Sequence, residues 1–269
     1  MGIADIRERI DIVTPTVLLR TAKLSRSFGR LLAVDAVDFE VRQGELRSVI
    51  GPNGAGKSTF FKLIAGEMPP TAGRVFFDGE DITGRPHSAI SRRGIAKSYQ
   101  ITTIFPQLTV FENVRVAAQC RRSVMNCWAR ADRMAGVAQT AHHILRLVEL
   151  DTKADLLAAH LGHGLQRHLE VAIALACDPK LLLLDEPTAG MSPEETERTI
   201  ALIKRISAGR TVILVEHKMK VVMTISDRIT VLHQGAVLAE GTPGEIRENE
   251  RVQQVYLGHR PRAHAIARG

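Results

Sequence analysis

The chain reads Gly51-Pro52-Asn53-Gly54-Ala55-Gly56-Lys57-Ser58-Thr59 between an apolar run at residues 46–50 and a helical pattern at residues 60–65. This order of strand, glycine-rich turn and helix is the one that a phosphate-binding loop requires. The three glycines let successive backbone N–H groups point at a polyphosphate at the N-terminus of the helix. Lys57 is then placed to reach the β- and γ-phosphates of a nucleotide, and the Ser58 hydroxyl to bind Mg²⁺.

The composition is that of an ordinary globular protein, with 269 residues of which 45% are hydrophobic and 24% charged. A net charge of +7 could reflect binding to nucleic acid or to an anionic membrane surface, because phosphate attracts cations in both. The basic residues are scattered, however, with denser spots at residues 121–122 and 260–268. We therefore expect a solvated basic surface and no nucleic acid partner.

The three cysteines, Cys120, Cys127 and Cys177, form no CxxC pair and leave an odd count. This pattern argues against a disulfide framework or a zinc site and fits a reducing compartment. The longest apolar runs, such as residues 181–184, fall far short of the roughly 20 residues that a membrane span needs. The N-terminus does not resemble a signal peptide, so we expect a soluble, cytoplasmic chain.

The chain divides by pattern into a core and its additions. Residues 1–16 read as an N-terminal extension, and residues 259–269 as a basic C-terminal tail. The pattern at residues 17–42 predicts β-strands at a sheet edge. Residues 105–165 read as a helical subdomain inserted into an α/β core. Its first predicted helix carries apolar residues on one face, at Val110, Val114, Ala117 and Ala118.

An aromatic residue beside a turn residue, Phe28-Gly29, lies between the first two predicted strands. Two roles are open for Phe28. It is either a hydrophobic plug at a hairpin or a stacking face for the base of the nucleotide, as aromatic rings stack on other π-systems.

A second group of candidate residues follows two buried strands. The continuous apolar run at residues 181–184 ends in Asp185-Glu186, and His217 comes shortly after the run at residues 211–215. The carboxyl ends of parallel strands are where α/β sheets bind ligands. Asp185 suits the Mg²⁺ shell, Glu186 can orient or deprotonate an attacking water, and His217 can sense a γ-phosphate.

A glycine-containing turn at residues 161–167 precedes an amphipathic helical run. Gly162 and Gly164 at the start of a helix leave N–H groups facing outward and can form a second anion site. Alone, this signal is weak.

Together these motifs resemble the nucleotide-binding subunit of an ATP-binding cassette (ABC) transporter over residues 17–258. The resemblance identifies the Walker A loop at residues 51–59, the Q-loop at Gln100, Walker B with its acid at residues 184–188, and the switch histidine at His217. It implies an α/β fold, namely a P-loop NTPase core of the ABC ATPase class with an antiparallel β subdomain and an inserted helical subdomain. It also implies ATP and Mg²⁺ as cofactors.

The resemblance further implies roles for single residues. The catalytic residues are Glu186, His217 and Gln100. The metal ligands are Ser58, Gln100 and Asp185. The nucleotide contacts that it implies are Gly51, Pro52, Asn53, Gly54, Ala55, Gly56, Lys57, Ser58, Thr59, Gly162 and Gly164, and Phe28 is added as a nucleotide contact from its place beside the turn alone.

A closer resemblance is to the branched-chain (hydrophobic) amino acid uptake subfamily, carried by residues 100–110, 185–196 and 216–219. Related urea-type importers share similar motifs, so import of urea or a short amide stays open as an alternative. A soluble, non-transport ABC ATPase that acts on nucleic acid or ribosomes is a further alternative. Such proteins usually carry two cassettes, whereas this chain carries a single P-loop.

The resemblance also implies the partners. Two ATPase chains, identical or different, close head to tail on two Mg-ATP and drive transmembrane permease subunits through a groove beside Gln100 and residues 101–110. A periplasmic or lipid-anchored substrate-binding protein takes part indirectly. The ATPase is then peripheral, on the cytoplasmic face of the inner membrane.

The chain departs from the family pattern at its signature loop. That loop usually reads Leu-Ser-Gly-Gly-Gln, or Leu-Ser-Tyr-Gly-Glu in this branch, whereas residues 161–165 are Leu-Gly-His-Gly-Leu. The Ser hydroxyl and the polar fifth residue are lost, and the Gly164 backbone donor remains. Since the loop completes the ATP site of the opposite subunit, we expect an impaired partner site unless the backbone N–H groups suffice.

Overall fold

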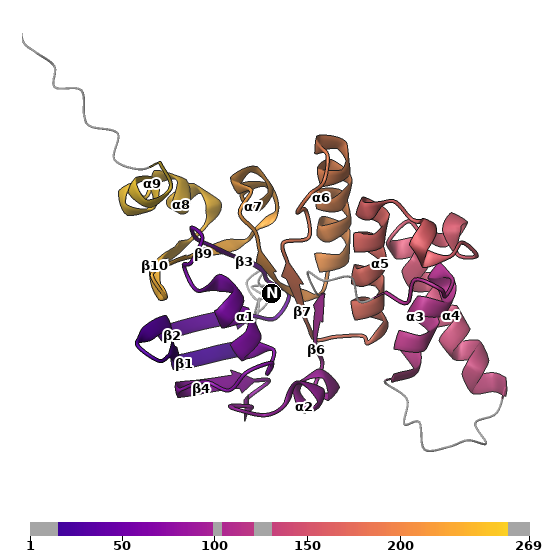
Figure 1. Ribbon diagram of the computed structural model, residues 1–269, viewed down its shortest axis with the longest axis horizontal. Coiled ribbons are helices and arrows are strands. Elements are labelled where there is room, and N and C mark those ends of the chain that lie inside the picture. The colour runs from indigo at the N-terminus through magenta and orange to yellow at the C-terminus, as the bar shows by residue number, and fades with distance from the viewer. Residues whose placement is uncertain (1–15, 99–103, 121–130, 258–269) are drawn as a thin grey trace, which may run out of the picture.

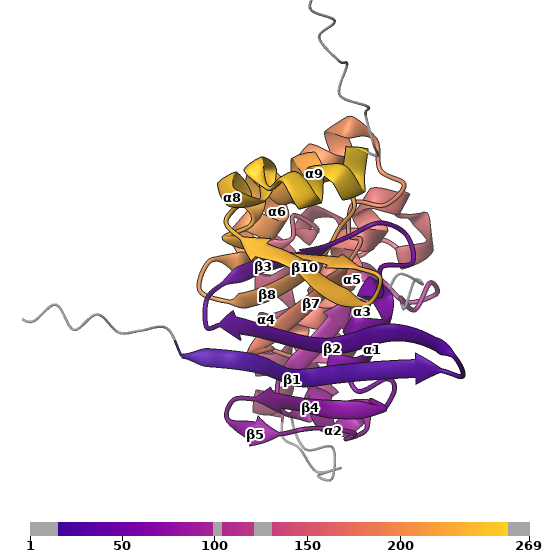
Figure 2. The ribbon, with the colours of Figure 1, turned by 90° about the vertical axis from the view of Figure 1, so that its left-hand side faces the viewer.

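The computed structural model describes residues 16–98, 104–120 and 131–257, which form two β-sheets flanked by helices (Figures 1 and 2). The strands are β1 (Val17–Phe28), β2 (Leu31–Arg42), β3 (Leu46–Ile50), β4 (Ala72–Phe77), β5 (Glu80–Asp81), β6 (Ile95–Ser98), β7 (Leu181–Asp185), β8 (Thr211–Val215), β9 (Arg228–His233) and β10 (Ala236–Gly241). The α-helices are α1 (Lys57–Ile64), α2 (His87–Arg92), α3 (Val110–Cys120), α4 (Ala131–Leu147), α5 (His163–Ala176), α6 (Pro193–Ser207), α7 (Met219–Ile225), α8 (Pro243–Glu248) and α9 (Glu250–Leu257). Two short 3₁₀ turns are η1 (Asp151–Lys153) and η2 (Ala158–His160).

The larger sheet has six strands in the order β10-β9-β3-β8-β7-β6. Strands β9, β3, β8, β7 and β6 pair in parallel, and the β9–β10 hairpin is antiparallel. β7 and β8 are buried along their whole length. Leu181 and Leu183 join the core on one face, while Leu182 and Leu184 join the core on the other. The covering of both faces explains the continuous apolar runs in the sequence.

The smaller sheet is antiparallel, in the order β2-β1-β4-β5, and lies at the front of Figure 2. Its long hairpin β1–β2 turns at Gly29, which confirms the predicted strands and the antiparallel β subdomain. Helix α1 lies between the two sheets (Figure 1). Phe60 of α1 meets Phe39 of β2 edge to face, with ring centroids 5.1 Å apart.

Helices α3, α4 and α5 gather at the far side of the larger sheet (Figure 1). The predicted apolar face of α3 is buried, at Val110, Val114, Ala117 and Ala118. These residues share one core with Leu182 and Leu184 of β7. The inserted helices are thus confirmed as part of the fold, and their limits at residues 105 and 165 stay a prediction.

The C-terminal part is the hairpin β9–β10 followed by two short helices, α8 and α9. Their apolar residues form a separate core over the strand that leads into the phosphate loop. This core contains Ile50, Val222, Ile229, Val231, Ile246 and Val252.

Several predictions fall outside the described residues. They concern the N-terminal extension up to residue 15, Gln100, Cys127, residues 121–122 and the basic tail at residues 259–269. Within the described ranges, no helix is both long enough and apolar enough to cross a membrane.

Candidate active site

The loop from Gly51 to Gly56 joins β3 to α1 and depends on close backbone approaches. A Cβ at Gly51 would lie 2.2 Å from the carbonyl oxygen of Leu232 on β9, and one at Gly56 would lie 2.3 Å from that of Ala33 on β2. Gly56 also has a φ of 97°, which L side chains rarely adopt. The glycines thus seat the loop against both sheets, and α1 begins directly after it with its first N–H groups available to an anion.

Lys57 is held inside the loop. Its Nζ donates to the carbonyl oxygens of Gly51, at 2.7 Å, and Pro52, at 3.0 Å. Burial lowers the pKa of Lys57, and the charges of Glu186 and Asp185 partly oppose this shift. The ammonium group of Lys57 is therefore stabilised by the loop carbonyls through hydrogen bonds and by the two acids through their charge.

A cavity of about 510 Å³ opens over the loop. It is lined by Phe28, Leu31, Leu32, Ala33, Asn53, Gly54, Ala55, Gly56, Lys57, Ser58, Thr59, Glu186 and Gln234. Phe28 is one of the lining residues and is 44% exposed. The Arg26 guanidinium lies 4.9 Å from the centroid of its ring. The ring is therefore not a buried plug, and its role in stacking on a base stays a prediction.

Asp185 ends β7 and is buried, with 9% of its surface exposed. Burial raises the pKa of its carboxyl group, and the ammonium group of Lys97, 3.9 Å away, lowers it. Lys97 also donates to Glu67 Oε1 at 2.9 Å. Lys97 and Glu67 were not predicted, because the two residues are 30 positions apart in the chain and no local pattern marks the pair.

Glu186 follows at the mouth of the cavity, with a φ of +47° that is uncommon for a residue other than glycine. Its N–H donates to the Val215 carbonyl at the end of β8, 2.9 Å away. Its Oε1 lies 4.0 Å from Nδ1 of His217, whose side chain is half-exposed. The predicted base and the predicted γ-phosphate sensor therefore face each other beside the loop.

Glu216 is a residue that sequence reasoning missed. Its carboxylate is fully buried and accepts from the N–H and hydroxyl of Thr188, and from the N–H groups of His217 and Lys218. Lys218 Nζ in turn donates to the Thr188 carbonyl, 2.8 Å away. These contacts fasten the turn after Glu186 to the turn that carries His217. The apolar run before Glu216 could have drawn attention to it, but the partners of Glu216 are visible only in the fold.

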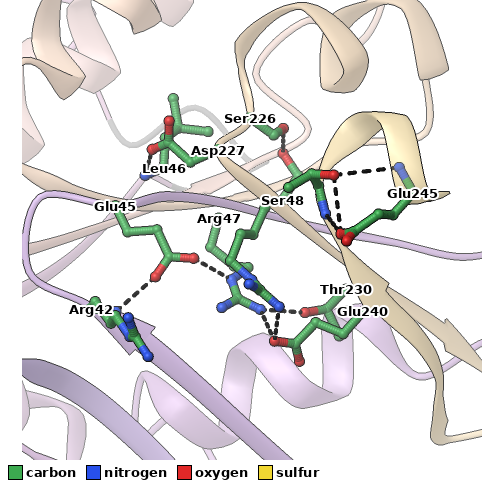
Figure 3. A network of polar contacts seen from close by, with 12 residues as sticks. Arg42, Glu45, Leu46, Arg47, Ser48, Ser226, Asp227, Thr230, Glu240 and Glu245 are labelled. Carbon is green, nitrogen blue, oxygen red and sulfur yellow. Dashed lines mark hydrogen bonds and ion pairs between the residues drawn. The ribbon is translucent and has the colours of Figure 1, made fainter. Parts of the chain in front are cut away.

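The strand that leads into the loop is held by a polar network around the buried Arg47 (Figure 3). Arg47 of β3 forms ion pairs with Glu45 and with Glu240 of β10, both at 2.6 Å, and donates to the Thr230 hydroxyl of β9 at 3.1 Å. At the start of the strand, the Leu46 N–H donates to the Asp227 carboxylate at 2.7 Å. The network fixes β3 to the C-terminal hairpin.

Gly162 and Gly164 do not line the cavity of their own chain. They lie at the N-terminus of α5, where a Cβ on Gly164 would be 2.8 Å from Oε1 of Glu195. Glu195 belongs to the capping box that Ser192 forms at the start of α6. The predicted second anion site is therefore separate from the phosphate loop within one chain.

The residues present fit a nucleotide with Mg²⁺. No side chain fits at Gly51 or Gly56, so the phosphate loop presents only backbone atoms at these two positions. The Ser58 hydroxyl and the Asp185 carboxylate are hard oxygen ligands of the kind that Mg²⁺ prefers. The charge of Lys57 suits the phosphates.

The fold and site define a P-loop ATPase of the ABC class. A family model for ABC transporters matches residues 34–189, and one for the branched-chain amino acid ATP-binding cassette transporter matches residues 236–261. The chain belongs to the ABC transporter family as its ATP-binding subunit. It binds nucleotide, hydrolyses ATP and pairs with permease components.

Two relatives and one solved structure make the comparison concrete. The chain is 42% identical to the high-affinity branched-chain amino acid transport ATP-binding protein BraF of Pseudomonas aeruginosa, over 90% of this chain and 98% of that protein. It is 39% identical, with the same coverage, to the high-affinity branched-chain amino acid transport ATP-binding protein LivG of Escherichia coli. An ATP-binding cassette of an ABC transporter in its ADP conformation matches with a TM-score of 0.80 and 29% identity, over 91% of this chain and 100% of that one.

Proposed function

We propose that the chain energises an importer of branched-chain amino acids. The observation that carries this proposal is the match of residues 236–261 to the branched-chain amino acid cassette model. These residues lie outside residues 34–189, which match the general model for ABC transporters, so they carry information on the subfamily. The names of the two relatives support the same substrate class. The substrate itself would contact the permease and its binding protein.

The geometry supports a route to hydrolysis in which Lys57 changes partners. Its Nζ leaves the carbonyls of Gly51 and Pro52 and binds the β- and γ-phosphates. Ser58 and Asp185 would hold Mg²⁺, which would neutralise charge at the phosphate oxygens. Glu186 accepts a proton from the attacking water, and His217 contacts the γ-phosphate and keeps it aligned with Glu186. Gln100 would complete the shell.

In the assembly that we propose, two ATPase chains close head to tail, and the α5 N-terminus of one chain completes the site of the other. Closure moves the permease subunits, and a periplasmic or lipid-anchored binding protein delivers the substrate to them. The ATPase is then a peripheral protein on the cytoplasmic face of the inner membrane. The pair can be a homodimer or a heterodimer.

The test is uptake into proteoliposomes that contain the permease subunits, this chain and any second ATPase chain, with Mg-ATP trapped inside and the binding protein outside. We expect ATP-dependent uptake of labelled leucine that unlabelled isoleucine and valine reduce and urea does not. The matched control is Glu186→Gln, which should abolish uptake while the complex still assembles. Competition by urea or a short amide, or ATP hydrolysis without amino acid uptake, would contradict the proposed substrate class.

A further inference from the structure

The last described helix, α9, places a tyrosine against the strand that leads into the phosphate loop. Tyr256 packs on the C-terminal core, which includes Ile50, the residue directly before the loop. Its hydroxyl is buried and has no partner at full hydrogen-bond geometry in the described part of the chain. Burial raises the pKa of the phenol, and the backbone of Gly51 is the group that opposes this shift. The hydroxyl therefore faces the first residue of the loop.

An unpaired buried hydroxyl is unfavourable for the nucleotide-free protein. Such a group costs on the order of 1–3 kcal/mol when it has no partner. A phenylalanine would fill the same space without this cost. The hydroxyl would be favourable if a different state of the loop supplied a hydrogen-bond partner for it.

Gly51 is one of the two loop residues whose carbonyl holds Lys57 in the nucleotide-free protein. Its carbonyl accepts from Lys57 Nζ at 2.7 Å in this structure. This step rests on the proposed function, in which Lys57 exchanges the Gly51 carbonyl for the phosphates. The peptide groups on either side of Gly51 are then free to settle against α9.

We propose that Tyr256 is a positioning residue of the nucleotide site: once the loop holds a nucleotide, the Gly51 N–H donates a hydrogen bond to the Tyr256 hydroxyl. This bond anchors the loop to the C-terminal helix and favours its nucleotide-bound form. The inference concerns nucleotide binding and is independent of the transported substrate.

The C-terminal segment that carries Tyr256 is also bound to β3, the strand that leads into the loop. Helices α8 and α9 pack on β10, and Glu240 of β10 forms an ion pair with the buried Arg47 of β3 (Figure 3). Arg47 also bonds to Thr230 of β9. These contacts hold β3, which leads into Gly51, and the C-terminal segment that carries Tyr256 against each other.

The test is Tyr256→Phe in the full chain, which removes one oxygen atom and keeps the ring. Titration calorimetry with ADP should show a dissociation constant that is about 3- to 10-fold higher than for the unchanged protein, the loss expected for one hydrogen bond. The melting temperature without nucleotide should stay the same or rise, because an unpaired hydroxyl is removed. The KM for ATP should rise, with kcat little changed.

Val252→Ala is the matched control, because Val252 lies on the same helix and in the same core. It should lower the melting temperature through a cavity and leave the ADP dissociation constant unchanged. An unchanged dissociation constant in Tyr256→Phe would overturn the proposal. An equal rise in both variants would also overturn it, since packing of α9 rather than the hydroxyl would then control binding.

Discussion

Single residues in this site work through backbone groups as much as through each other. Lys57 rests on two loop carbonyls, and Glu216 is surrounded by N–H and hydroxyl donors. Buried charges are costly in proteins unless such partners surround them. The position of Glu216 is therefore set before a nucleotide arrives, and the Lys57 ammonium group is held at the loop until it moves to the phosphates.

Lys57→Ala tests the residue that this arrangement places at the phosphates. The change removes a charge-assisted contact, which is worth about 1.5–3 kcal/mol, so nucleotide affinity should fall about 10- to 100-fold. Calorimetric titration with ADP and ATP measures the effect, and an unchanged circular dichroism spectrum shows that the fold is intact. Retention of the original affinity would refute the assignment of the loop.

Residue types and local order were sufficient to predict the loop, the two acids at the end of β7 and the histidine after β8. They were insufficient for Glu216 and Lys97. The partners of these side chains, Thr188 and Glu67, are 28 and 30 positions away in the sequence. A single sequence contains no signal for such pairings, because they depend on how the strands are ordered in the sheet.

At the scale of elements, helix α5 connects the inserted helices to the sheet. It packs against α3, α4, α6, β6 and β7, and its start was predicted from a weak glycine signal. The buried strands were predictable because runs covered on both faces are apolar throughout. The packing partners of α5 were not, since an amphipathic pattern identifies a buried face but not the element that covers it.

The α5–α6 contact contains a histidine that makes stability depend on pH. His168 is buried, and its Nε2 lies 3.1 Å from the hydroxyl oxygen of Thr199 on α6. Burial lowers the pKa of His168 below its ordinary value of 6.5. As the pH falls below 6.5, the unfolded chain therefore binds a proton at this position that the folded chain does not, and stability is lost.

His168→Gln should reduce this sensitivity to acid. The expected loss in the unchanged protein is at most about 1.4 kcal/mol per pH unit below about 6.5. The measurement is the difference in the free energy of unfolding between about pH 7.5 and about pH 5.5 for each protein, which cancels any constant cost of the substitution. An equal difference in both proteins would exclude His168 as the source.

At the scale of the whole molecule, one chain contains one phosphate loop, while its α5 N-terminus lies away from that loop's cavity. A head-to-tail pair of chains requires this separation of the loop from the α5 N-terminus, because the α5 N-terminus of each chain would then complete the nucleotide site of its partner. A Cβ added at Gly162 would meet no heavy atom of the described residues within 4 Å, and the φ of −63° is ordinary for any residue. A serine therefore fits there without strain.

Gly162→Ser tests whether the departure in the signature loop impairs the partner's site. A serine hydroxyl adds one charge-assisted hydrogen bond to a γ-phosphate, worth on the order of 1.5–3 kcal/mol when well formed. We expect the ATPase rate of the assembled transporter to rise several-fold. In a heterodimer, the site built from Lys57 and Glu186 of this chain should carry most of the turnover before the change. An unchanged rate would show that the backbone N–H groups suffice.

In the proposed function, Glu186 activates the attacking water for ATP hydrolysis at this site. The most direct measurement is the steady-state ATPase rate of the assembled transporter with Glu186→Gln, alongside its affinity for ATP. The substitution keeps the shape of the side chain and removes its basic carboxylate. We predict a rate loss of about 10²- to 10⁴-fold with ATP affinity retained. Hydrolysis near the unchanged rate would contradict the claim.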